Sequence, residues 1–317
     1  MTERHGDDAD GRDLADVAIV GGGAAGLSAA LVLARARRRV LVVDSGAPRN
    51  AVATHVHGFL SREGTPPTEL LATGRAEVAG YGGEIVAASV RDAVRTGEGF
   101  AVRLLDDRTL LARRILLASG LTDELPEVPG LAQRWGRDVL SCPYCHGWEV
   151  RDQPLAVLGT GPLSVHHALM LRQWSEDVTL IRHGLTEIGS DDRRRLAARD
   201  IRVVDGVVDH VVVDHDRLTG MGLLDGAVVP CAAVFVSARL LANHGVVASL
   251  GVEVERDELG ERVATDHIGQ TSIHGVWAAG NVTDPFAQVI VAAAAGAKVA
   301  MALNAELVED DVSVAVA

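Results

Sequence analysis

Apolar and polar positions follow the same plan in two blocks of this chain. Residues 16–44, DVAIVGGGAAGLSAALVLARARRRVLVVD, run from an apolar stretch through a glycine turn into a helical pattern and a second apolar stretch. Residues 153–183, QPLAVLGTGPLSVHHALMLRQWSEDVTLIRH, repeat that order, and the first glycines of the two turns, Gly21 and Gly159, are 159 − 21 = 138 residues apart. Each block predicts a strand–helix–strand unit with parallel strands. We therefore expect an α/β fold with two Rossmann-like nucleotide-binding domains.

Further apolar stretches predict how the two domains are connected. Residues 113–120, RRILLASG, read as a strand that ends in a small-residue turn, and the two prolines of ELPEVPG mark a crossover. Residues 271–285, TSIHGVWAAGNVTDP, predict another strand and turn, and an alanine-rich helical pattern follows. The first domain should thus be discontinuous, with the second inserted into it. The expected ranges are 1–121 and 249–317 for the first domain, and 122–248 for the second.

Composition and charge narrow the class of partner. The 317 residues are 48% hydrophobic and carry a formal net charge of −13. Nucleic acids and anionic membranes both require a basic surface, so neither is expected as a partner. Residues 1–13 are polar and acidic without an apolar signal-peptide core, and the apolar run at 289–303 is short and interrupted by Lys298. These features predict a cytoplasmic protein.

The first glycine turn has the features of a dinucleotide site. Gly21, Gly23 and Gly26 form a GxGxxG directly after a predicted strand and before a predicted helix, which lets a pyrophosphate approach the backbone. Asp44 ends the second strand, where an acid can hold a ribose hydroxyl and would repel a 2′-phosphate. We therefore expect a dinucleotide without a 2′-phosphate here.

The second glycine turn is less complete. It has Gly159 and Gly161, but Ser164 stands at the position of the third glycine. A 2′-phosphate would need a cluster of arginines after the second strand. Arg182 is the one obvious candidate, and Arg193–Arg195 lie further on. Two interpretations stay open, a working NADPH site and a Rossmann scaffold whose nucleotide site has decayed.

The stretch SCPYCHGWEV, residues 141–150, carries the clearest candidate chemistry. Cys142 and Cys145 are two of only three cysteines, and His146 follows directly. A zinc site needs four ligands, and neither a second CxxC nor a suitably spaced histidine pair supplies them, so no metal is expected. A redox disulfide needs a reactive thiolate, a second thiol and a group that moves protons, which these three residues provide. The lone Cys231 reads as a small core residue.

The order of these pieces resembles the low-molecular-weight thioredoxin reductase-like flavoproteins. GGGAAG, LLASG, CPYC and WAAGNVTDP follow one another as in that family, and the resemblance covers the whole chain. It implies FAD as cofactor and a homodimer. It also implies that four further residues contact FAD: Gly280, Asn281, Gln288 and Asn50. Asn281 replaces the family's usual aspartate, Gln288 lies near the flavin, and Asn50 belongs to the stretch GAPRN after the ribose acid. It also implies that Cys145 faces the flavin and that Cys142 exchanges with substrate.

The segment CPYCHGWE, residues 142–149, is similar to the dithiol oxidases that close disulfides in gliotoxin- and holomycin-type natural products. Family reductases usually have an aspartate where this chain has His146, and histidine can accept a thiol proton near neutral pH. The resemblance implies a small-molecule dithiol as substrate, O2 as electron acceptor and no need for NADPH. Two alternatives remain: an NADPH-dependent thioredoxin-disulfide reductase, and a flavin redox sensor without turnover. The acidic tail 307–317 is either disordered or lies at the edge of a neighbour's pocket.

Overall fold

The computed structural model describes residues 14–161 and 163–317, so the N-terminal segment 1–13 lies outside the described residues. The first predicted unit is confirmed. It consists of β1 (Ala15–Val20), α1 (Ala24–Arg35) and β2 (Val40–Asp44), and β1 pairs in parallel with β2. Both strands are buried almost throughout, because they lie inside the sheet and apolar clusters cover both of its faces.

Five parallel strands form the centre of the first sheet, in the order β3-β2-β1-β6-β19. Strand β6 has two neighbours on its far side, because β5 pairs with its first half and β19 with its second half. The additional elements of this domain are β3 (Glu84–Ala87), β4 (Val90–Thr96), β5 (Gly99–Leu104), β6 (Thr109–Leu117), β19 (Val276–Ala278), η1 (Arg49–Val52), α2 (Pro67–Gly80) and η3 (Gly280–Val282).

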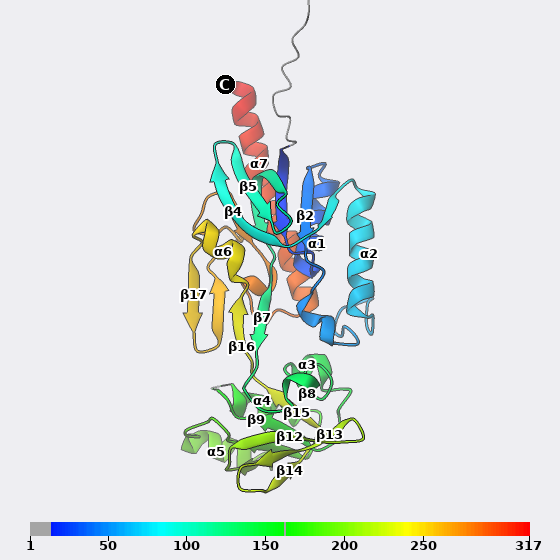
Figure 1. Ribbon diagram of the computed structural model, residues 1–317, viewed down its shortest axis with the longest axis vertical. Helices are drawn as coiled ribbons and strands as arrows, with labels where there is room; N and C mark the ends of the chain where they lie inside the picture. Colours follow the sequence, from blue (N-terminus) through cyan, green and yellow to red (C-terminus); the bar gives the residue numbers. More distant parts are fainter. Residues whose placement is uncertain (1–13, 162) are drawn as a thin grey trace, which may run out of the picture.

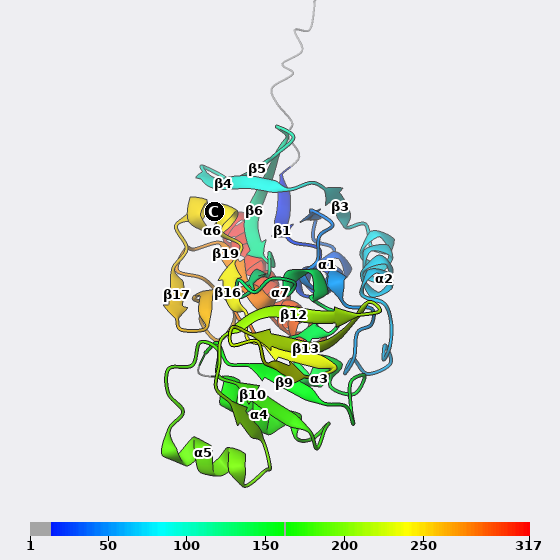
Figure 2. The same ribbon diagram turned by 60° about the horizontal axis from the view of Figure 1, so that its bottom comes forward.

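The second predicted unit is confirmed as well. Its elements β9 (Leu155–Leu158), α4 (Ser164–Leu171) and β10 (Val178–Ile181) belong to a parallel sheet of order β11-β10-β9-β15-β8. Helices cover one face of this sheet, and the antiparallel β12-β13-β14 lies against the other (Figure 2). The remaining elements are β8 (Val139–Leu140), β11 (Arg202–Val204), β12 (Val208–Asp214), β13 (Arg217–Leu223), β14 (Val228–Pro230), β15 (Ala233–Val236), η2 (Ala132–Arg134), α3 (Pro143–His146) and α5 (Ser190–Ala197).

Two antiparallel strands connect the domains (Figure 1). β7 (Leu121–Glu124) leads into the inserted domain and β16 (Arg239–Ala242) leads back, and both join a four-stranded sheet with β17 (Val254–Asp257) and β18 (Gly260–Val263). The next helix, α6 (His244–Leu250), already packs its Val246 and Val247 into the core of the first domain. The expected boundary between residues 248 and 249 therefore falls inside α6, because sequence pattern alone does not show which core a short apolar helix joins.

The C-terminal helix α7 (Val289–Val316) packs against α1. Gly296 permits this close approach, since a Cβ atom there would lie 2.0 Å from the carbonyl oxygen of Ala25. The tail 307–317 continues α7 as far as Val316. Acids of this helix meet arginines of the first domain: Arg114 binds Glu306 and Asp310, and Arg38 binds Asp311. By length and composition α7 could span a membrane, but this packing and these ion pairs are those of a helix that belongs to the α/β fold.

Candidate active site

The two cysteines of the CxxC segment form a disulfide at the start of α3. Their Cα atoms are 5.2 Å apart, and both residues are half-buried. Cys142 caps the helix, and the backbone N–H of Cys145 donates a hydrogen bond to Sγ of Cys142 over 3.2 Å. Such a donor stabilises negative charge on sulfur, so it favours the thiolate of Cys142 when the disulfide opens.

His146 ends α3 and is half-buried beside the disulfide. Burial lowers the pKa of His146 below the ordinary value of histidine, the nearby carboxylate of Glu149 raises the pKa again, and His57 lowers it. Since burial is the largest of these effects, the imidazole stays neutral at neutral pH. A neutral imidazole next to a dithiol centre can accept a thiol proton.

A loop of the first domain contacts this segment of the second. His57 lies between two acids: its Nδ1 is 2.6 Å from Oε1 of Glu63, and its Nε2 is 3.5 Å from Oε1 of Glu149. Glu63 also accepts a hydrogen bond from the backbone N–H of Gly58 over 2.8 Å, and its pKa is lowered by the contact with His57. No motif of the sequence marks His57 or Glu63 individually as a site residue. Their stretch HGFLSREG has no local pattern that shows which part of the chain it contacts.

The first glycine turn fits a dinucleotide pyrophosphate. Gly21 has φ +109°, and a Cβ at Gly26 would lie 1.9 Å from the carbonyl oxygen of Gly21, so both positions require glycine. A Cβ at Gly23 would meet no atom within 4 Å, and no side chain caps the start of α1 in the described part of the chain. The hydroxyl of Ser119, beside Gly21, is buried without a hydrogen-bond partner among the described residues. Open space, a helix start without a side-chain cap and an unsatisfied hydroxyl are what a bound phosphate group needs.

Asp44 lies directly over this glycine turn. Its Oδ2 accepts a hydrogen bond from Arg75 over 2.7 Å and its Oδ1 accepts one from the N–H of Gly46 over 3.1 Å. Each oxygen keeps a second lone pair, so the residue can still accept a hydrogen bond from a ribose hydroxyl. Arg75, on α2, is a contact that the sequence did not suggest, since it comes from an element outside the strand–helix–strand unit.

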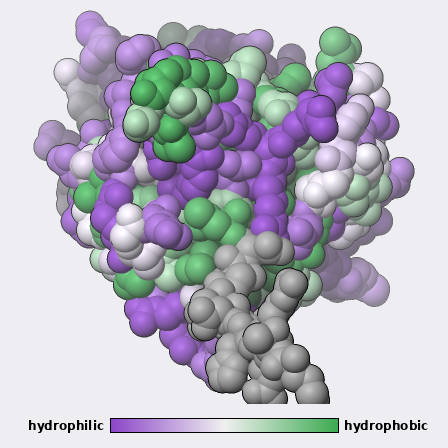
Figure 3. All heavy atoms as spheres, turned by 90° about the horizontal axis from the view of Figure 1, so that it is seen from above, coloured by the Kyte–Doolittle hydropathy of each residue, from purple (hydrophilic) through white to green (hydrophobic). Residues whose placement is uncertain are grey.

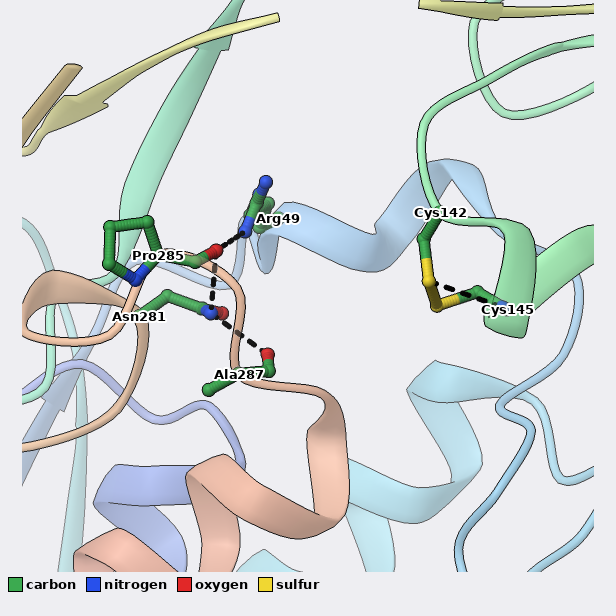
Figure 4. The surroundings of a disulfide bond; sticks show 6 residues. All are labelled: Arg49, Cys142, Cys145, Asn281, Pro285 and Ala287. Carbon is green, nitrogen blue, oxygen red and sulfur yellow. Dashed lines mark hydrogen bonds between the residues drawn. A yellow bond between two sulfur atoms is a disulfide. The ribbon is translucent and has the colours of Figure 1, made fainter. Parts of the chain in front are cut away.

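Asn281 holds the loop that leads into α7. Its Nδ2 donates to the carbonyl oxygens of Asp284, Pro285 and Ala287 over 3.1, 3.3 and 2.9 Å. Figure 4 shows this loop opposite the disulfide, with Arg49 donating to the carbonyl oxygen of Pro285 as well. An aspartate has no donor for these carbonyls, which explains physically why an amide serves at this position. Asn281 therefore has a positioning role that its resemblance to a cofactor contact did not imply.

The other expected cofactor residues surround this loop. Gly280 begins η3, just before Asn281, and Gln288 forms the N-cap of α7. The Oε1 atom of Gln288 lies 3.7 Å from where a Cβ of Gly58 would be, which brings it to the His57 loop. Asn50 is half-buried in η1, next to Arg49.

The second glycine turn is occupied by its own side chains. The hydroxyl of Ser164 accepts hydrogen bonds from the N–H groups of Thr160 and Gly161 over 3.2 and 3.3 Å. Arg182 donates to Asp205 and to the carbonyl oxygens of Leu185 and Thr186. The three later arginines have protein partners too: Arg193 the carbonyl oxygen of Ile188, Arg194 Asp191, and Arg195 Asp192.

Comparison with known proteins agrees with this geometry. Residues 15–296 match the family model described as pyridine nucleotide-disulphide oxidoreductase. Relatives include "Thioredoxin reductase tcpT" of Claviceps purpurea, 31% identical over 85% of this chain and 87% of the relative, and "Thioredoxin reductase sirT" of Leptosphaeria maculans, 29% identical over 94% and 96%. The crystal structure of HlmI matches with a TM-score of 0.90 and 54% identity over 96% of this chain and 95% of HlmI. The resemblance to thioredoxin reductase-like flavoproteins is thus confirmed, and the chain belongs to the pyridine nucleotide-disulphide oxidoreductase family.

Proposed function

We propose that this protein is an FAD-dependent dithiol oxidase that closes an intramolecular disulfide in a small-molecule natural product, with O2 as the electron acceptor. The observation that carries the proposal is a contrast between the two glycine turns. The first is open and fits a dinucleotide, whereas in the second the Ser164 hydroxyl accepts from two amides of the turn and Arg182 donates to Asp205. A reaction driven by the substrate dithiol requires only the first site.

The cysteines and His146 would carry out the exchange. His146 takes a proton from one substrate thiol, and the resulting thiolate attacks Sγ of Cys142, which breaks the Cys142–Cys145 bond. The second substrate thiolate then attacks the substrate sulfur of the mixed disulfide, which forms the product disulfide and releases Cys142. Two electrons have moved to the cysteine pair. His146 passes the first thiol proton to the departing Cys145 thiolate and is then free to accept the second. FAD, when bound, supplies the route by which those electrons reach O2, which is reduced to H2O2.

We assign the FAD contacts to the first domain. Gly21, Gly23 and Gly26 would hold the pyrophosphate at the start of α1, and Asp44 a ribose hydroxyl. Nearer the disulfide, Asn50, Gly280, Asn281 and Gln288 would surround the flavin. Support comes from the open space at Gly23, the unsatisfied Ser119 hydroxyl, and the position of the Asn281 loop opposite the disulfide.

Exposed aromatic side chains beside the disulfide favour a small organic substrate. Tyr144, between the cysteines, is 66% exposed, and Trp148, two residues after His146, is 64% exposed. The guanidinium of Arg151 stacks on the Trp148 ring at 4.0 Å, and Tyr144 meets Trp174 edge-on. Rigid rings next to a reactive disulfide can bind an apolar ring compound with little loss of conformational entropy.

The alternative is an NADPH-dependent thioredoxin reductase, which the names of the fungal relatives favour. It would require Ser164 and Arg182 to give up their present hydrogen bonds, each of which contributes about 0.5–1.5 kcal/mol, or more for a charged group. The cost of breaking several such contacts makes this alternative the weaker one.

The proposal includes a cytoplasmic homodimer. The dimer is supported by the outer face of α7, where four apolar side chains are between 44% and 59% exposed: Val291, Met301, Val308 and Val312. This helix runs to the upper end of the molecule in Figure 1, and apolar surface gathers there in the view from above (Figure 3). Light scattering should give twice the chain mass, and charged substitutions at Val308 and Val312 should lower it.

Steady-state turnover tests the function directly. Purified protein, supplied with FAD, air and a cyclisable dithiol but no nicotinamide, should consume O2 and release an equal amount of H2O2. The Cys142→Ser variant serves as the control without a disulfide. No oxygen uptake by the flavin-loaded protein with any of a panel of dithiols would contradict the proposal.

A further inference from the structure

The loop that contains His57 touches the redox segment from across the domain boundary. His57 belongs to the first domain and Glu149 follows the CxxCH segment in the second, yet His57 Nε2 and Glu149 Oε1 are 3.5 Å apart. The His57 side chain is 21% exposed and that of Glu149 43%. This contact therefore lies at the edge of the reaction site and is partly shielded from water.

Glu63 fixes the orientation of the His57 ring. It receives hydrogen bonds from His57 Nδ1 and from the N–H of Gly58, so one carboxylate holds both the ring and the backbone beside it. With Nδ1 donating to Glu63, Nε2 can donate to Glu149 when the ring carries its second proton. The ring is thus aimed at Glu149 by a contact within its own loop.

We propose that His57 and Glu149 form a positioning pair for the base His146, because their contact holds the loop of the first domain against the segment that carries this base. This inference rests on the proposed function, because it assigns His146 the role of accepting a substrate proton. The pair assembles only when the loop of the first domain lies on the CxxC segment. Proton uptake by His146 is thereby tied to the arrangement in which the disulfide is next to the flavin-binding domain.

Among the described residues, two ionisable side chains act on the pKa of His146, those of Glu149 and His57. Glu149 lies on the same segment as His146, and His57 lies in the opposing loop of the first domain. Glu63 contacts His57 from within that loop. Cys142 and Cys145 carry no proton while they are joined. Burial lowers the pKa of His146, and Glu149 and His57 act on that pKa in opposite directions. Two residues in contact with each other should therefore have opposite effects on the same base.

The test compares His57→Gln with Glu149→Gln in the FAD-loaded protein. Anaerobic stopped-flow reduction of the flavin by dithiothreitol is followed across pH, and the apparent pKa of the acid limb is determined for each variant. In His57→Gln the acid limb of the rate–pH profile should move to higher pH, and in Glu149→Gln it should move to lower pH. At a pH on the wild-type limb, His57→Gln should be slower and Glu149→Gln faster than wild type, each by roughly 2- to 5-fold, the scale of a partly exposed ion pair.

His55→Gln and Asp152→Asn are the matched controls, and both should keep the wild-type profile. His55 is a neighbour of His57, with ring centroids 6.1 Å apart, and Asp152 is an exposed acid three positions after Glu149 in the sequence. Shifts in the same direction, or no shift, in the two test variants would overturn the positioning pair. If dithiothreitol fails to reduce wild-type flavin at all, the proposed function fails instead, so the two failures are distinguishable.

Discussion

At the residue scale, the two cysteines have different surroundings although they share one disulfide. The Sγ atom of Cys142 accepts a hydrogen bond from the backbone N–H of Cys145. Cys145, in contrast, is followed directly by His146, which is shielded from water. The remaining thiol, Cys231, is buried, and burial raises its pKa to about 12, so it takes no part in thiolate chemistry. The redox chemistry is thus confined to the CxxCH segment.

The roles of the cysteines can be separated by single substitutions. In Cys142→Ser the remaining Cys145 thiolate should lie next to the flavin and produce a long-wavelength charge-transfer absorption. In Cys145→Ser the remaining Cys142 should not produce it. Absorption spectra of both FAD-loaded variants, recorded as a function of pH, check this assignment, and equal spectra would show that it is wrong.

His146→Ala should slow the reduction of the flavin by a dithiol by roughly 100-fold near neutral pH, the usual scale for the loss of a general base. Because burial lowers the pKa of His146, the wild-type rate should persist as pH falls and decline only below the ordinary histidine value. Stopped-flow rates across pH measure both effects, and circular dichroism confirms that the variant is folded. A folded variant with the wild-type rate would make Glu149 the next candidate for the base.

At the element scale, the strands and helices were largely predictable, because each strand–helix–strand unit is encoded by local periodicity. The contacts between the residues of the site were not predictable from the sequence. Arg75 reaches Asp44 from α2, and His57 reaches Glu149 from a loop, so each pair joins segments that no local pattern relates. Asn281 could be expected near the flavin, but its three bonds to one loop depend on the path of the backbone after β19.

The glycine turn before α1 gives a test that separates folding from cofactor binding. Gly23→Ala should leave stability within about 0.5 kcal/mol of wild type, since its Cβ meets nothing in the protein. It should weaken FAD binding by roughly 10-fold or more, because the methyl group enters the space meant for the pyrophosphate. Gly26→Ala should instead destabilise the fold, as its Cβ would lie 1.9 Å from the carbonyl oxygen of Gly21. Denaturant unfolding and FAD titration of the apoproteins distinguish these outcomes, and unchanged FAD affinity in Gly23→Ala would contradict the assignment.

The loop before α7 should not tolerate an aspartate at position 281, the residue that the family resemblance implied there. Asn281→Asp replaces a donor with a carboxylate that faces three carbonyl oxygens, and we expect a loss of roughly 1–3 kcal/mol in the free energy of unfolding. Asn304→Asp is the matched control, since Asn304 already uses its Oδ1 as an acceptor for Arg38. Urea unfolding of both variants measures the difference. Equal stabilities would show that the Asn281 amide does not hold the loop.

At the scale of the whole molecule, the two domains share the strand–helix–strand unit but differ in whether its glycine turn is open to a nucleotide. The first leaves its glycine turn open, and the second fills its turn with Ser164 and holds Arg182 in its own loop. The sequence shows that Ser164 stands in place of the third glycine. Only the structure shows that the Ser164 hydroxyl accepts hydrogen bonds from two backbone amides of the same turn. The contact of His57 with Glu149 joins the disulfide segment to the first domain, and Arg49 binds Asp123 on the connecting strand β7.

The most direct test of the oxidase assignment is anaerobic stopped-flow reduction of the bound flavin by NADPH and, separately, by a small cyclisable dithiol. The dithiol should bleach the flavin rapidly, and admission of O2 should restore its colour with release of H2O2. NADPH should bleach it slowly or not at all, because the groups that would bind its phosphates are occupied by the protein's own side chains. Rapid bleaching by NADPH, at the rate of catalytic turnover, would contradict the oxidase assignment and establish the chain as a reductase.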